Sequence, residues 1–193
     1  MKPVALLSAL LLCVALVEAA PVSPPLALLP GLQTGEAPWR RGSEFLRERL
    51  QAIGLPALKA EGTVVHTHEH LDIFVLGRHI QIPTGVGIDE QERFIAPIHT
   101  HDQTGVLHVE SDEAREFTLG QFFDMWGVLL TESCLGAHCA DADHTLKFYV
   151  DGREVPDARA VELKHHMQIA IVYARRGAAP VNVPWIYKFP GDL

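Results

Sequence analysis

The sequence predicts a mainly β fold of the α+β class: a compact antiparallel β domain built from two related hairpin units plus two helices. Two observations predict it. The same pattern of strand, turn and strand occurs over residues 71–78 and again over 146–153. Residues 43–53 and 118–126 instead place apolar side chains at helical spacing behind a capping residue.

Composition narrows the class of protein. The chain has 193 residues, of which 48% are hydrophobic and 21% are charged, which is typical of a folded globular domain. We expect a single domain over residues 43–193. The formal net charge of −8 excludes nucleic acid as a partner and disfavours an anionic membrane surface, because both attract clustered Lys and Arg.

The N-terminus predicts a signal peptide over residues 1–19. Lys2 precedes an apolar run, and Val17 and Ala19 supply the small or β-branched residues that a signal peptidase reads. The mature chain is then exported to a periplasmic or extracellular location. A retained membrane anchor is the alternative, which the short run and the proline at Pro21 disfavour.

The next two segments have clear compositional signals. Residues 20–42 contain five prolines and predict an extended arm. Ser43 can cap a first helix that ends near Ile53, because Gly54 and a proline follow.

Alternating apolar residues predict strands from Thr63 onward. A second helix begins at Thr118, whose side chain pairs with Gln121 in a T-x-x-Q capping box. Three further strands are predicted over 146–150, 161–163 and 169–173.

The two hairpin units differ in histidine content. Leu71 and Leu146 begin the matching segments, 75 residues apart, and each unit leads to a histidine-bearing segment that ends in a hydrophobic strand. Common turn chemistry could produce this match by chance. The first unit carries histidines where the second has other residues, so the scaffold does not need them in order to fold. These other residues are Asp141, Ala142, Asp143 and Lys147.

Two cysteines of the exported chain lie close together. Cys134 and Cys139 enclose four residues in a compartment that permits disulfides, which predicts a local bridge. The alternative is a metal site that adds His138 and His144 to the two thiolates, but its ligand spacing is unusual.

Histidine is the compositional outlier, with 11 residues in the chain. His66, His68 and His70 alternate along a predicted strand, so they lie on one face with neighbours about 6.5–7 Å apart. Neighbouring imidazoles at this spacing can converge on one metal ion.

A second histidine segment completes the predicted metal site. His99, His101 and His108 can meet the first group if the two segments pair. Four carboxylates lie near enough in sequence to orient the ring N–H groups: Glu69, Asp72, Asp102 and Glu110. Alternatives are unliganded surface histidines or a pH sensor. Other histidines are assigned to the surface or to turns: His79, His165 and His166.

Ligand type narrows the metal. All-imidazole coordination suits zinc, copper or iron, and export favours copper or zinc over ferrous iron. The predicted cofactor is therefore a copper or zinc ion.

Two resemblances follow from the histidine motifs. His66-Thr-His-Glu-His-Leu71 is similar to the first metal strand of amidohydrolases and phosphotriesterases, but their barrels need about 250 residues. A closer one covers residues 63–175. The stretches HTHEHLDIFV, IHTHDQTGVLHVES and FTLGQFFDMWG resemble a group of uncharacterised histidine-rich bacterial proteins that are exported or membrane-anchored. This resemblance implies export and a shared histidine site, and implies no reaction.

Three functions follow from this reasoning. The first is an exported metal-binding protein for sequestration, delivery or redox, whose partners are the metal ion and an exported or membrane-associated protein. The second is a secreted mononuclear metalloenzyme with three histidine ligands, an open position, and Glu69 or Glu110 as base. The third is an extracytoplasmic interaction module with a structural metal. A closed site favours binding, and an open one favours chemistry.

Overall fold

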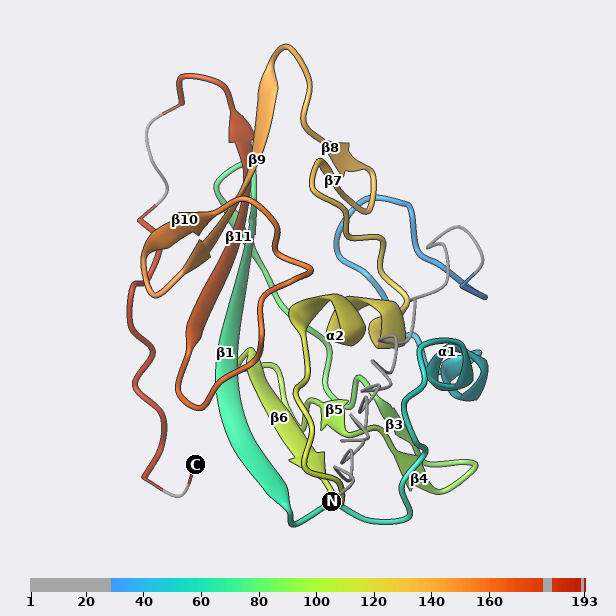
Figure 1. Ribbon diagram of the computed structural model, residues 1–193. Coiled ribbons are helices and arrows are strands. Elements are labelled where there is room, and N and C mark those ends of the chain that lie inside the picture. The colour runs from blue at the N-terminus through green and yellow to red at the C-terminus, as the bar shows by residue number, and fades with distance from the viewer. Residues whose placement is uncertain (1–28, 179–181, 192) are drawn as a thin grey trace, which may run out of the picture.

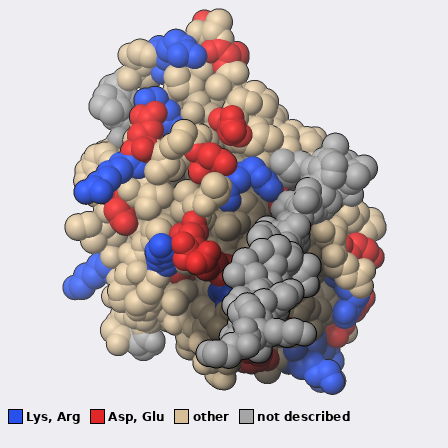
Figure 2. Space-filling model, in the orientation of Figure 1, with Lys and Arg blue, Asp and Glu red and all other residues tan. Residues whose placement is uncertain are grey.

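The computed structural model describes residues 29–178, 182–191 and 193. The predicted signal peptide and residues 20–28 of the predicted arm lie outside these residues. Among the described residues, no helix is long and apolar enough to cross a membrane. Acidic and basic side chains are interspersed over the face of the molecule seen in Figure 2.

A seven-stranded sheet organises the domain, in the order β10-β9-β11-β1-β6-β5, with β2 also paired to β1 (Figure 1). The pairing of β1 with β11 is parallel, and the other pairings in this sheet are antiparallel. This confirms the mainly β class. The strands are β1 (Val65–Val75), β2 (Arg78–Ile80), β5 (Ile98–His99), β6 (Val106–Ser111), β9 (His144–Val150), β10 (Arg153–Val155) and β11 (Gln168–Arg175).

The part of the chain that the structure describes also contains two helices and two short ribbons: α1 (Leu46–Ala52), α2 (Leu119–Trp126), β3 (Ile88–Asp89) with β4 (Phe94–Ile95), and β7 (Cys134–Leu135) with β8 (His138–Cys139). Figure 1 shows the helices on one side of the sheet and the C-terminal segment on the other. The sheet is thus covered on both faces.

Strand alternation on β1 assigns its side chains to these two layers. Leu71 and Ile73 belong to the main core, together with the α2 residues Phe122 and Trp126. Phe74 packs on the other side, in a smaller cluster that includes residues of β11 and the C-terminal segment. The even-numbered residues of β1 therefore face away from the main core.

Of the two predicted helix N-caps, one is present and the other is not. Thr118 and Gln121 form the predicted capping box at the start of α2. The predicted cap at Ser43 is wrong, because α1 begins at Leu46 and has no side-chain cap. The backbone carbonyl of Ser43 accepts the Leu46 N–H at 3.2 Å instead, through a turn in which Phe45 has φ 60°.

Two other segments differ from expectation. The predicted strand over 161–163 is wrong, because only Glu162 forms an isolated bridge there, and the Val161 carbonyl accepts the Leu119 N–H at the start of α2 at 2.9 Å. Residues 29–42 pack on the domain rather than extending from it. Trp39 is buried, and the Gln33 N–H donates to the Gly127 carbonyl at 2.7 Å.

The two predicted hairpins are present, and their turns are alike. Leu76 and Gly77 have φ 50° and 80°, and Asp151 and Gly152 have φ 47° and 76°. Two successive positive φ angles are typical of type I′ turns. The units differ beyond the turn: β6 joins the edge of β1 that β2 occupies, whereas β11 joins the edge of β9 opposite β10.

Candidate metal centre

The register of the β1–β6 and β5–β6 pairings brings the histidine segments together. In the antiparallel pairing of β1 with β6, His68 lies opposite His108 and His66 lies opposite Glu110. In the pairing of β5 with β6, His99 also lies opposite His108. Directly paired residues project from the same face of a sheet, so these side chains share the face that points away from the main core.

The imidazoles form a continuous cluster. Ring centroids are 4.9 Å apart for His66 and His68, 4.6 Å for His68 and His108, 4.5 Å for His101 and His108, and 4.8 Å for His99 and His101. Five of the six predicted ligands therefore lie together, in contact along three short segments of chain.

Glu110 lies within this cluster. Its Oε1 is 3.5 Å from His66 Nε2 and 3.4 Å from His108 Nδ1. Its Oε2 is 3.8 Å from His99 Nε2. The sequence predicts an orienting role or the role of a base for this carboxylate, but its distances are also those of a direct ligand.

Among the described residues, two groups of side chains could hold a metal ion. In each group, ligand atoms from different residues all lie within 4.8 Å of one another. The first group, hereafter the closed set, is His99, His101, His108 and Glu110. The second, hereafter the open set, is His66, His68 and Glu110.

Backbone contacts orient the most buried ligand. The ring nitrogen Nδ1 of His99 lies 3.0 Å from the Ala96 carbonyl, which can only accept, so Nδ1 carries the proton. The Nε2 lone pair then points towards His101, whose Nε2 is 3.1 Å away. A ligating histidine typically donates its other N–H in this way.

The charge state of the cluster suits a cation. Burial, reinforced by nearby His101, lowers the pKa of His99 to about 4. Burial, followed by the charges of His108 and His66, lowers the pKa of His68 to about 4. Burial alone would raise the pKa of Glu110, but its contact with His108 and the nearby histidines outweigh this and lower it. At neutral pH His68 and His99 are therefore neutral imidazoles beside the Glu110 carboxylate, the forms in which these groups bind metal.

Several buried polar atoms of the cluster lack a hydrogen-bond partner among the described residues: both ring nitrogens of His68, Nδ1 of His108 and Oε2 of Glu110. Unsatisfied buried polar atoms are uncommon because each carries a desolvation penalty. Four of the unpartnered buried side-chain atoms among the described residues thus lie in this cluster, and the others belong to Thr67 and Glu69.

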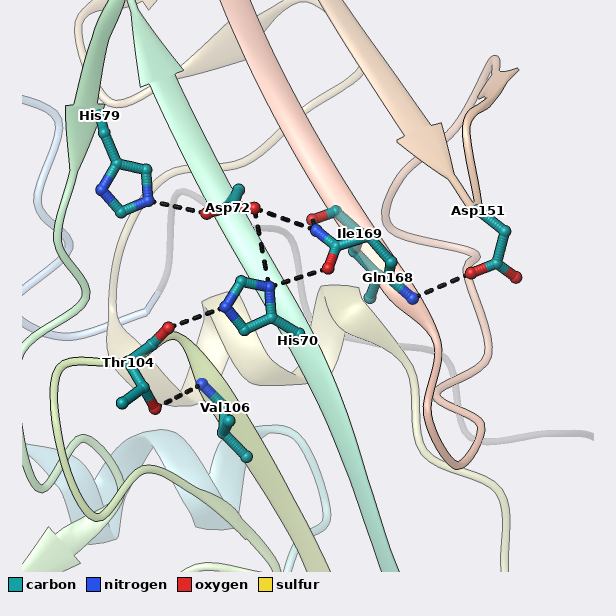
Figure 3. Close-up of polar contacts among 8 residues, drawn as sticks. All are labelled: His70, Asp72, His79, Thr104, Val106, Asp151, Gln168 and Ile169. Carbon is teal, nitrogen blue, oxygen red and sulfur yellow. Dashed lines mark hydrogen bonds and ion pairs between the residues drawn. The ribbon is translucent and has the colours of Figure 1, made fainter. Parts of the chain in front are cut away.

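His70 is separate from the cluster. Its Nδ1 is 2.9 Å from Gln168 Oε1, and its Nε2 is 2.8 Å from the Thr104 carbonyl (Figure 3). Its ring also stacks on Tyr187, with centroids 3.7 Å apart. Because both nitrogens have other partners, His70 does not belong to either ligand set.

The other predicted orienting carboxylates take different positions. Asp72 accepts from Gln168 Nε2 at 3.0 Å and lies 2.7 Å from His79 Nε2, so it orders the His70 network and not the cluster (Figure 3). Asp102 accepts from the Thr104 N–H at 2.8 Å, within a turn beside the cluster.

Glu69 does not orient any histidine. It projects from the opposite face of β1, is fully buried, and has no hydrogen-bond partner for either carboxylate oxygen among the described residues. Burial raises its pKa to about 7. The correction follows from strand alternation: if His68 and His70 share one face, Glu69 must lie on the other.

Two further residues adjoin the cluster, and one of them, His165, lies in an exposed turn as predicted. The His165 ring centroid is 6.1 Å from that of His68, and His165 Nδ1 accepts the His68 backbone N–H at 3.3 Å. Exposed Glu61 lies 3.3 Å from His101 Nε2. His165 adjoins the cluster because it lies just before β11, the parallel partner of β1, and the sequence gives no signal for that pairing.

The cysteines form the predicted disulfide, between Cys134 and Cys139. Their thiolates are therefore unavailable to a metal. His138 Nε2 instead accepts the Ala37 N–H at 3.2 Å, and His144 Nδ1 lies 3.0 Å from Asp141.

No protein-family model, curated protein or solved structure matches the chain. The resemblance to histidine-rich exported proteins therefore stays a prediction, and the function is argued from the site.

Proposed function

We propose that this protein is an exported metal-binding protein that holds one copper or zinc ion in the closed set. The observation that supports this most is the position of Glu110, a buried carboxylate whose two oxygens face imidazole nitrogens at 3.4–3.8 Å. The ligands would be Nε2 of His99, one ring nitrogen each of His101 and His108, and a Glu110 oxygen.

The donor set favours zinc or copper as the metal. Three imidazole nitrogens and one carboxylate oxygen are common zinc ligands, and imidazole also suits copper. Iron is less favoured, because the proposed compartment is oxidising. The Cys134–Cys139 disulfide supports that compartment.

Ligand number supports binding over catalysis at this ion. Four protein donors complete a tetrahedral shell, which is typical of sites that retain a metal. His99 is fully buried, whereas the His101 side chain is 42% exposed. The ion would therefore enter and leave past His101, which suits sequestration or delivery to an exported or membrane-associated partner.

The test is zinc affinity of the folded protein, measured by competition with a chromophoric chelator. His99→Ala should weaken zinc binding by more than the roughly 10–100-fold that loss of an outer-shell partner costs. Circular dichroism should show an unchanged fold, since the second hairpin unit has no such cluster.

Two controls accompany this test. His165→Ala removes a neighbouring imidazole that is not a proposed ligand, and should leave the affinity unchanged. The double variant Cys134→Ser/Cys139→Ser should retain its metal and lose about 2 kcal/mol of stability from the small loop. Equal losses from His99→Ala and His165→Ala, or no loss from either, would contradict the proposed ligand set.

A further inference from the structure

His68 is not explained by the closed set. It is 4% exposed, and neither ring nitrogen has a hydrogen-bond partner among the described residues. Its neighbour across the sheet, His108, offers only the edge of a ring, with planes at 86°. An imidazole with two buried, unpartnered ring nitrogens points to a ligand that binds there.

The neighbours of His68 provide further donors for such a ligand. The His66 ring is 4.9 Å away, and His66 Nε2 lies 3.5 Å from Glu110 Oε1. The other carboxylate oxygen, Oε2, faces His99 of the closed set. Oε1 lies between His66 Nε2 at 3.5 Å and His108 Nδ1 of the closed set at 3.4 Å, so Glu110 contacts both histidine groups, as a bridging carboxylate would.

We propose that the open set binds a second metal ion, so that Glu110 bridges a dinuclear centre. The proposal rests on the proposed function for the first ion. Its ligands are one ring nitrogen of His68, His66 Nε2 and Glu110 Oε1. Carboxylate bridges are a common way to hold two ions a few ångströms apart, at about 3.5–4 Å.

The second ion has fewer protein ligands than the first. His165 does not complete its shell, because His165 Nδ1 accepts a backbone hydrogen bond and the ring proton is then on Nε2. The His66 side chain is 58% exposed, so this side of the ion faces solvent. Three protein donors and an open position allow water or a small oxyanion to bind the metal. The second ion is therefore the exchangeable, reactive member of the pair.

Metal stoichiometry tests this proposal on the full chain. The protein is saturated with zinc, desalted and analysed by plasma mass spectrometry, with folding monitored by circular dichroism. The wild type and His165→Ala should hold two zinc ions per chain, and His68→Ala should hold one. Loading with Cu(II) gives a second readout that needs no variant. A carboxylate-bridged pair should show a spin-coupled, attenuated electron paramagnetic resonance signal.

The outcomes separate the two proposals. One ion in the wild type, unchanged in His68→Ala and lost in His99→Ala, would overturn the second site and leave the first. No bound ion in the wild type would overturn both. Two ions that persist in His68→Ala, or a wild-type Cu(II) signal from two uncoupled ions, would overturn the shared-carboxylate centre. If His68→Ala does not fold, the wild-type stoichiometry and Cu(II) coupling still decide.

Discussion

The two hairpins of the main sheet share a core and a turn conformation, but only the first carries the histidine cluster. Leu71 and Ile73 of the β1–β2 hairpin enter the same core as Leu146 and Phe148 of the β9–β10 hairpin. Both turns have two successive positive φ angles. The hairpins differ in what precedes the matching residues, where β1 extends by six further residues that begin at Val65 and pair with β6.

The histidines of β1 lie in this extension. At the same offset of 75 residues, His66 and His68 correspond to Asp141 and Asp143, which lie in a turn before β9. The Asp141 carboxylate accepts the backbone N–H of Asp143, so its role is local. The β9–β10 hairpin thus shows that this strand–turn–strand unit folds without a histidine cluster. Burial of the polar residues of β1 therefore lowers the free energy of unfolding, and we attribute their presence to function.

The largest expected effect of these buried residues is a loss of stability when the pH is lowered. In metal-free protein, His68 and His99 have pKa values near 4, whereas a free histidine has 6.5. The unfolded chain therefore binds more protons, and the free energy of unfolding should decrease as pH falls from 6.5 to 4. The loss should reach roughly 3 kcal/mol for each residue.

Urea denaturation across this pH range, with a chelator present, measures this loss. The double variant His68→Gln/His99→Gln should show a much flatter dependence on pH. An equally steep decrease in the double variant would mean that the sensitivity arises outside the cluster, and the contrast between the hairpins would not hold.

Glu69 should show an effect of opposite sign and similar size. Its pKa of about 7 lies above the free value of 4.5, so the folded state keeps a proton that the unfolded state gives up. The free energy of unfolding therefore decreases as pH rises from 4.5 to 7, and the penalty is complete above pH 7. Glu69→Gln should stabilise the protein above pH 7 by up to roughly 3 kcal/mol, with no gain below pH 4.5.

The same denaturation series measures this gain. Between pH 4.5 and 6.5 the two effects oppose each other, so the histidine-dependent slope should be steeper in Glu69→Gln than in the wild type. Destabilisation by Glu69→Gln at pH 8 would show that the carboxylate has a folding role.

Local structural features were predictable from the sequence where a few neighbouring residues determine them. The Thr118 capping box, the two hairpin turns and the Cys134–Cys139 bridge each depend on residues close in the chain. The histidine cluster was predictable in outline, because spacing of two on a strand places side chains on one face. Alternation also implied the opposite position of Glu69.

Long-range pairing was not predictable in this way. The partners of His70 include Gln168, 98 residues away, because β11 joins β1 in parallel. The central position of Glu110 depends on the register of β1 with β6, which places it opposite His66. Sequence spacing contains no information on either register, so His70 was grouped with its neighbours and Glu110 was given an outer role.

The smallest expected effect lies in the turns themselves. Leu76 has φ 50°, a left-handed conformation that costs a residue with a Cβ about 1–2 kcal/mol, whereas Asn adopts it more readily. Asp151 occupies the matching position at φ 47° and also accepts the Gln168 N–H at 2.9 Å. Leu76 is 49% exposed and loses little burial when replaced. Leu76→Asn should therefore stabilise the protein by roughly 0.5–1 kcal/mol in urea denaturation, with metal content unchanged. Asp151→Asn is the matched control and should give no such gain, since that turn already has a residue suited to its backbone. A loss of stability in Leu76→Asn would show that the half-exposed leucine contributes packing that the second hairpin lacks.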